Sequence, residues 1–63
     1  MTTTEALAQL TTAQTEQRAA RAERAATLHL HVNDPARIAG HARLARANRA
    51  TMAARHAVRR AGA

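Results

Sequence analysis

The 63-residue chain contains no cysteine, no aromatic residue, no lysine and no serine. Without cysteine it can form neither a disulfide framework nor a thiolate metal site. Serine, cysteine and lysine are common nucleophiles in covalent catalysis, and the two glycines are too few for a glycine-rich phosphate loop. We therefore expect a protein that is not an enzyme and that needs no cofactor.

Long hydrophobic runs are absent as well. No stretch approaches the roughly 18 apolar residues that a membrane-spanning helix requires. The first ten residues, MTTTEALAQL, lack the basic start and the apolar run of a signal peptide. These features predict a cytoplasmic protein.

Large apolar side chains are scarce. Hydrophobic residues make up 46% of the chain, but 19 of these 29 residues are alanine, and apart from Met1 only nine are larger. A chain of this length lies near the lower limit at which one core can hold a fold. We expect a single domain over residues 1–63, with a homodimer or a larger partner supplying the burial that a monomer lacks.

Acidic residues are few. Ten arginines stand against four carboxylates, which gives a net charge of +6. Residues 1–34 carry three arginines and four acids (−1), whereas residues 35–63 carry seven arginines and no acid (+7). Such a balance is typical of proteins that bind a polyanion. A GC-rich genome would explain the choice of arginine over lysine, but it would not explain the shortage of acids.

The residues that are abundant, namely alanine, arginine, glutamine and leucine, are strong helix formers. Thr2 and Glu5 have the spacing of a capping box. The sequence NDP at 33–35 offers a side-chain cap followed by proline at the first helical position. These signals predict an all-α fold, an antiparallel two-helix hairpin roughly 40 Å long. The helices are expected over residues 4–31 and 35–61.

Two features oppose these boundaries. The segment LHLHV at 28–32 alternates like a strand. Glycine inside a helix costs about 1 kcal/mol, so Gly40 leaves open a second helix that begins near His41.

Small uncharged residues repeat with 4-3 spacing along both predicted helices, and such stripes let two helices pack closely. In the second helix the stripe is Gly40, Leu44, Ala47, Thr51, Ala54, Val58 and Ala61. In the first helix it is Ala8, Thr12, Thr15, Ala19, Ala22 and Ala26. We expect the two stripes to face each other.

Five larger apolar residues lie outside these stripes and form short apolar lines on the predicted helices. They are Leu7, Leu10, Leu28, Ile38 and Met52. We expect them to join two hairpins into a four-helix bundle or to dock onto a partner. The alternative is that they are singly exposed, which is normal on any protein surface.

A basic octet occurs twice, as RAARAERA at 18–25 and as RLARANRA at 43–50. If the turn is centred between Asn33 and Asp34, two residues whose numbers add up to about 67 lie at the same height on the two helices. The stripes above then bring two arginine triads onto one face. The predicted nucleic-acid-binding residues are Arg18, Arg21, Arg24, Arg43, Arg46 and Arg49.

None of these six arginines has an acid three or four positions away, where helix neighbours interact. Three of the four acids are expected on the opposite face, with Arg55, Arg59 and His41 as partial partners. They are Glu5, Glu16 and Glu23. One face is thus predicted to be balanced and the other to need an anion.

Arginine suits phosphate, and a face without aromatics suits a duplex or folded RNA backbone better than single strands. We therefore expect non-catalytic binding to duplex DNA or structured RNA. In length and outline this hairpin resembles the plasmid-encoded RNA-binding hairpin dimers, a likeness of architecture that carries over no residue. The main alternative is an adaptor that docks onto an acidic protein surface. The octet could also recur by chance in an alanine- and arginine-rich chain.

The histidines raise the question of a metal site. His29 and His31 are two positions apart, so on a helix they point about 200° away from each other and cannot chelate one ion. His41 lies nearby, but neither a cysteine nor a free acid completes a ligand set. We expect no metal.

Overall fold

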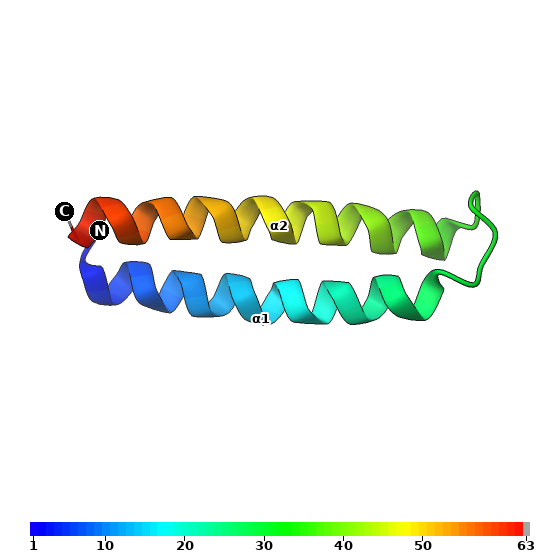
Figure 1. The fold of residues 1–63 in the computed structure, drawn as a ribbon, viewed down its shortest axis with the longest axis horizontal. Helices are drawn as coiled ribbons and strands as arrows, with labels where there is room; N and C mark the ends of the chain where they lie inside the picture. The colour runs from blue at the N-terminus through cyan, green and yellow to red at the C-terminus, as the bar shows by residue number, and fades with distance from the viewer. Residues whose placement is uncertain (63) are drawn as a thin grey trace.

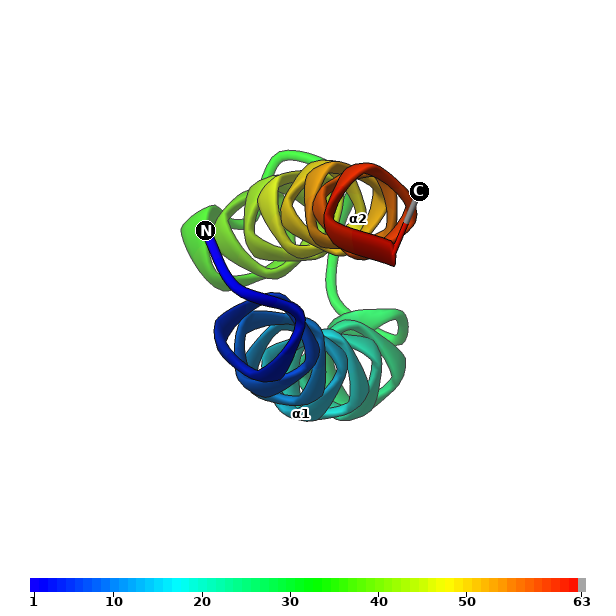
Figure 2. The ribbon, with the colours of Figure 1, turned by 90° about the vertical axis from the view of Figure 1, so that its left-hand side faces the viewer.

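In a computed structural model, which describes residues 1–62, the chain forms two helices, α1 (Thr3–Thr27) and α2 (Pro35–Gly62). The helices run antiparallel, with the turn at one end and both termini at the other (Figure 1). The molecule is a rod whose Cα atoms span 46 × 14 × 11 Å. Viewed from the end, the two helices lie side by side with a slight crossing (Figure 2). The predicted all-α antiparallel hairpin is confirmed.

The start of α1 is fixed by the expected capping box. The backbone N–H of Glu5 donates to Thr2 Oγ1 at 3.1 Å, and the backbone N–H of Thr2 donates to Glu5 Oε1 at 3.3 Å. These two bonds satisfy donors that have no partner inside the helix. The Glu5 carboxylate is therefore engaged within its own chain.

The predicted end of the first helix at residue 31 is wrong, because α1 ends at Thr27. The segment 28–34 forms a turn in which the N–H of Leu30 donates to Thr27 O and the N–H of Asp34 donates to His31 O. The Arg37 guanidinium reaches over from α2, and its Nη1 donates to the carbonyls of Leu28 at 3.2 Å and Leu30 at 3.0 Å. In a longer helix these two carbonyls would accept from backbone N–H groups. Here they accept from the Arg37 side chain instead.

The start of α2 agrees with the NDP signal. Asp34 caps the helix, since its Oδ1 accepts from the N–H of Ala36 at 2.9 Å, and Pro35 takes the first helical position. The helix continues through Gly40, so a start near His41 is wrong. Gly40 is buried against α1, and a methyl group there would lie 3.2 Å from Thr27 Oγ1. The glycine lets the two backbones approach closely.

The contact surface between the helices consists mainly of alanine. On α2 the buried residues are Gly40, Ala47, Thr51 and Ala54, with Leu44, Val58 and Ala61 half-buried between them. This is the predicted stripe. On α1 the buried residues are Ala6, Ala13 and Ala20. Leu10, Gln17, Arg24 and Thr27 are half-buried on the same side. The predicted stripe on the first helix is wrong, since all six of its residues are exposed.

Two contacts fix how the helices are aligned. Thr51 Oγ1 lies 3.4 Å from Ala13 O, and Thr3 Oγ1 donates to Ala61 O at 3.2 Å. In both pairs the residue numbers add up to 64, so any two residues whose numbers add up to 64 lie at the same height along the hairpin. Each level then sets a small residue against a larger one. The levels are Ala6 with Val58, Leu10 with Ala54, Ala13 with Thr51, Gln17 with Ala47, Ala20 with Leu44 and Arg24 with Gly40. Such alternation fills the space between helices without voids.

This alignment predicts opposite outcomes for two neighbouring alanines. Ala20 is fully buried opposite Leu44, so Ala20→Leu overpacks the contact and destabilises the fold by about 1–3 kcal/mol. In a domain of this size each kcal/mol lowers the melting temperature by about 4–8 °C. Ala19→Leu, on the exposed side, is expected to change stability by less than about 0.5 kcal/mol. Thermal unfolding followed by circular dichroism measures both. A larger loss in Ala19→Leu would contradict the observed alignment.

Candidate nucleic-acid interface

One arginine links the two helices through both glutamates of the central part of α1. Arg43 Nε lies 2.7 Å from Glu16 Oε2 and its Nη2 donates to Glu16 Oε1 at 2.7 Å, a two-pronged contact. The same guanidinium donates from Nη1 to Glu23 Oε1 at 3.2 Å. These are the ion pairs among residues 1–62, so Arg43 has its counterions inside the molecule.

The pairing changes the protonation equilibria of its members. The hydrogen bond from Arg43 lowers the pKa of Glu16 below its ordinary value, with smaller attraction from the charges of Arg43 and Arg46, against an opposing effect of desolvation. The hydrogen bond from Glu16 likewise raises the pKa of Arg43. A lowered folded-state pKa means that the Glu16 contact stabilises the fold above the unfolded-state pKa and is lost as pH falls through the folded-state value.

The carboxylates are thus all engaged. Glu16 and Glu23 bind Arg43, Glu5 completes the capping box and Asp34 caps α2. The chain has ten arginines and four acids, and Arg43 alone forms ion pairs with carboxylates in the described part of the chain. Nine arginines are left without a carboxylate partner among residues 1–62.

The observed α1 stripe lies two residues before the predicted one. Because each residue turns the helix by about 100°, the side of α1 that faces α2 differs from the predicted side by about 200°. Glu16 and Glu23 then lie about 70° to one side of the contact surface, and Arg21 lies about 70° to the other side. On α2, Arg43 lies on the side of the glutamates, as its ion pairs require. The hairpin therefore has two distinct broad faces.

We name these the carboxylate face and the acid-free face. The carboxylate face holds Glu16, Glu23, Arg43 and Arg46 among many alanines, whereas Arg49 and Arg60 point away from α1. The acid-free face holds Arg18, Arg21, His41, Arg55 and Arg59, and none of the three glutamates of α1, since Glu5 lies five full turns before Glu23 and points to the same side. Arg24 is half-buried at the border of the acid-free face, near the turn.

The predicted meeting of the two arginine triads on one face is wrong. Arg18 and Arg21 lie on the acid-free face, Arg43 and Arg46 lie on the other, and Arg49 points away from α1. The predicted partners of the glutamates are wrong too, because Arg43 takes that role. Arg55 and Arg59, which sequence reasoning assigned to the glutamates, join the acid-free face instead. Only the helix alignment reveals this, since no local spacing distinguishes these arginines.

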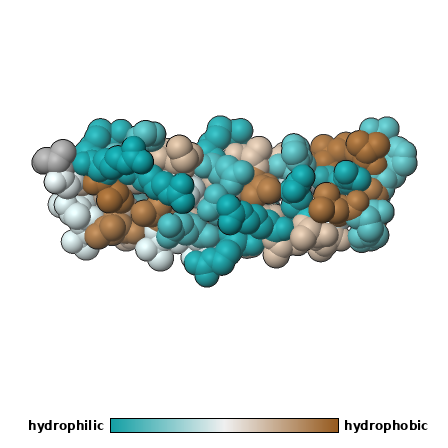
Figure 3. All heavy atoms as spheres, in the orientation of Figure 1, coloured by the Kyte–Doolittle hydropathy of each residue, from teal (hydrophilic) through white to brown (hydrophobic). Residues whose placement is uncertain are grey.

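Large apolar residues also lie along the acid-free face and at the turn end of the rod. Leu7, Leu28, Ile38 and Met52 are 45–54% exposed. Leu10 differs from them, because it lies half-buried in the contact surface between the helices. In Figure 3 hydrophobic side chains gather toward both ends of the rod, with mostly hydrophilic ones across its middle. The predicted interface set therefore divides into four exposed residues and one internal one.

The polar side chains beside these arginines are partly engaged. Gln17 Nε2 donates to Asn48 Oδ1 at 2.8 Å across the two helices. Within residues 1–62, no three side chains of the metal-ligating types lie together, and neither helix is long and apolar enough to cross a membrane.

Comparison with protein-family models, with curated proteins and with solved structures finds no match to this chain. The site must therefore be judged from its own residues.

The Glu16–Arg43 contact predicts a measurable titration. The side-chain carboxyl carbon of Glu16, followed by NMR against pH, is expected to titrate below the ordinary range of glutamate. In Arg43→Gln the pKa of Glu16 should rise toward its ordinary value, because the main cause of the shift is removed. Arg46→Gln is the control and should move it much less. Equal effects of the two substitutions would contradict the assignment of the shift to the hydrogen bond.

Proposed function

We propose that this protein is a non-catalytic binder of nucleic acid that contacts the phosphate backbone through its acid-free face. One observation carries the proposal: the four carboxylates are engaged inside the hairpin, and nine of the ten arginines have no carboxylate partner among residues 1–62. Like charges at helix spacings of three and four destabilise a helix. A polyanion relieves that repulsion.

The shape of the face suits an extended backbone. From the level of Arg59 to that of Arg24 the face extends roughly 28 Å, at 1.5 Å per helical residue. That length is a little less than one turn of duplex DNA, about 34 Å. A straight, two-helix rod can therefore follow one stretch of backbone with several guanidinium groups at once.

The chemistry of the face favours contacts that do not depend on base sequence. Arginine forms two-pronged hydrogen bonds with phosphate. Two amide side chains near these arginines, Gln17 and Asn48, bind each other. The absence of aromatic residues favours duplex DNA or structured RNA over single strands, which are usually bound by stacking.

The contact residues are revised accordingly. We assign phosphate contacts to Arg18, Arg21, Arg55 and Arg59. Arg43 is removed from the predicted set because Glu16 and Glu23 hold it, and Arg46 and Arg49 are removed because they lie off this face. Arg24 is left out because it is half-buried at the border of the face, in the groove at the turn end.

Two triple variants with equal loss of charge test the face. Arg18→Gln/Arg21→Gln/Arg55→Gln removes three of the proposed contacts, whereas Arg46→Gln/Arg49→Gln/Arg60→Gln removes three exposed arginines elsewhere. Binding to duplex DNA and to a structured RNA is measured by fluorescence anisotropy from low to moderate salt. The first variant should reduce the slope of log K against log salt by roughly three, since each phosphate contact contributes about 0.9.

The second triple variant is the control for general charge. It should keep most of the wild-type slope. Equal losses in the two variants would mean attraction to the whole molecule and no defined face. Phosphate contacts are strongest at low salt. If the unaltered protein binds neither nucleic acid at about 50 mM salt, the proposal is contradicted.

A second candidate function is supported by the exposed apolar residues. Leu7, Leu28 and Met52 lie along the acid-free face and Ile38 lies beside it at the turn end, as expected of a subunit that docks onto an acidic protein surface. Self-association through this face would set arginines against arginines, so a homodimer is less well matched than an acidic partner. The homodimer predicted from the sequence therefore stays a proposal, which sedimentation of the protein alone would test.

Leu7→Ser with Met52→Ser separates the two functions. Both side chains are about half exposed, so the hairpin should stay folded. If phosphate contacts carry the function, nucleic-acid affinity and its salt dependence should change by less than about twofold. A change in sedimenting mass or a large loss of affinity in this variant would instead assign the function to the apolar residues.

A further inference from the structure

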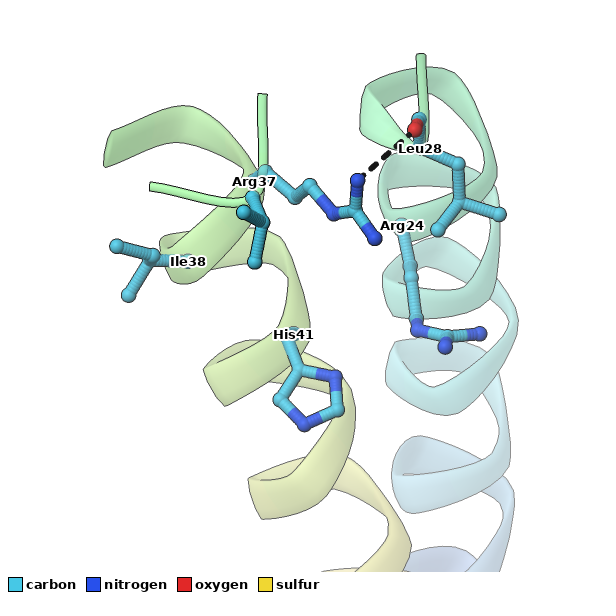
Figure 4. Close-up of a pocket in the computed structure, with 6 residues that line it drawn as sticks. Arg24, Leu28, Arg37, Ile38 and His41 are labelled. Carbon is cyan, nitrogen blue, oxygen red and sulfur yellow. Dashed lines mark hydrogen bonds between the residues drawn. The ribbon is translucent and has the colours of Figure 1, made fainter. Parts of the chain in front are cut away.

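The turn end of the hairpin holds a groove of about 320 Å³. It lies where the end of α1, the turn and the start of α2 meet, as the close-up in Figure 4 shows. Its lining residues are Arg24, Leu28, Val32, Arg37, Ile38 and His41. None of them is acidic.

Three aliphatic side chains form the apolar part of the groove. Leu28 is the C-cap residue that follows α1, Val32 lies in the turn and Ile38 belongs to the first turns of α2. They are 45%, 61% and 54% exposed, so nothing within residues 1–62 covers them. Residues on both sides of the turn thus contribute uncovered aliphatic groups to the groove, and Ile38 forms its outer edge, because its side chain points away from α1 (Figure 4).

The cationic part of the groove has unused donors. Arg37 is held by two bonds from Nη1 to the carbonyls of Leu28 and Leu30, and Figure 4 shows its guanidinium reaching across to α1. Its Nε and Nη2 donate to no atom of residues 1–62. Arg24 is half-buried, and its side chain has no hydrogen bond or ion pair within the described chain. His41 completes the rim.

We propose that this groove binds a small amphiphilic anion, a free fatty carboxylate with a single medium-length alkyl chain. The alkyl chain packs on Leu28, Val32 and Ile38, and the carboxylate takes the open donors of Arg24 and Arg37. The volume lies at the lower end of the range for small-molecule sites, about 300–1,000 Å³, which suits one short chain.

This site goes beyond the proposed nucleic-acid binding. A phosphate backbone offers no aliphatic group to the exposed leucine, valine and isoleucine of the groove, whereas a fatty carboxylate matches both its apolar and its cationic parts. The phosphate contacts proposed above belong to Arg18, Arg21, Arg55 and Arg59. The two sites therefore use different residues and can fail separately.

The test is a titration with sodium decanoate, below the concentration at which it forms micelles. The methyl resonances of Leu28, Val32 and Ile38 are followed by NMR. They should shift with saturation, while those of Leu7 and Met52 stay in place. Decyltrimethylammonium, which has the same chain with a positive head, and acetate, which has the head without a chain, should bind at least tenfold more weakly.

Two substitutions and two matched controls locate the site. Ile38→Ser should weaken decanoate binding about five- to tenfold through lost apolar contact. Arg24→Gln should weaken it about three- to fivefold through a lost, partly exposed charge contact. Met52→Ser and Arg18→Gln, on the same face but away from the groove, should leave it unchanged. Circular dichroism checks that each variant keeps its helices.

Three results would overturn the proposal. The first is equal binding of decanoate and decyltrimethylammonium, which would mean apolar contact alone. The second is equal weakening by Ile38→Ser and Met52→Ser, which would mean binding spread over the face. The third is binding to vesicles of anionic phospholipid without any binding to monomeric decanoate, which would assign the face to a membrane surface. None of these results bears on the salt dependence of nucleic-acid binding.

Discussion

The close packing of alanine and glycine against larger residues between the two helices determines the rest of this structure. Each level of the hairpin pairs a small side chain with a larger one, and the contacts of Thr51 with Ala13 and of Thr3 with Ala61 fix the alignment. Because a helix has 3.6 residues per turn, this alignment also determines which side every other residue faces. The separation of the charges into two faces follows from the packing of residues that carry no charge.

Electrostatics reinforces that packing. Arg43 binds Glu16 and Glu23, which lie two turns apart on α1, so one guanidinium ties α2 to a length of the other helix. The contact is partly exposed, and such pairs add modestly to stability. Its larger effect is on the distribution of charge, because it neutralises Glu16 and Glu23, which lie between Glu5 near the termini and Asp34 at the turn. The arginines of the opposite face have no carboxylate counterion among residues 1–62.

The architecture could be predicted from local signals, whereas the composition of the faces could not. The capping box at Thr2 and the NDP sequence gave both helix starts, since caps depend on adjacent residues alone. Just after the end of α1 the Leu28 carbonyl accepts from Arg37, nine residues later, and no local pattern reveals that bond. The α2 stripe was correct because Gly40 marks the close approach of the helices.

The α1 stripe was wrong because residues with charged or amide ends were excluded from the contact surface. Gln17 and Arg24 lie there half-buried, since long polar side chains can pack their aliphatic stems in a contact surface and keep their polar ends near water. Gln17 also finds Asn48 across the helices. Shifting the stripe by two residues rotated every arginine of α1, so the candidate site changed although the fold did not.

The alanine-rich contact has a further consequence for how the hairpin responds to temperature. The heat capacity change of unfolding grows with the apolar surface that is exposed, and it sets the curvature of stability against temperature. The buried hydrophobic residues of the described chain are all alanines, and no aromatic ring is present in the sequence. Unfolding therefore exposes little additional apolar surface to water. The stability of this hairpin follows a shallow curve, so it changes gradually on warming and is lost only slowly on cooling.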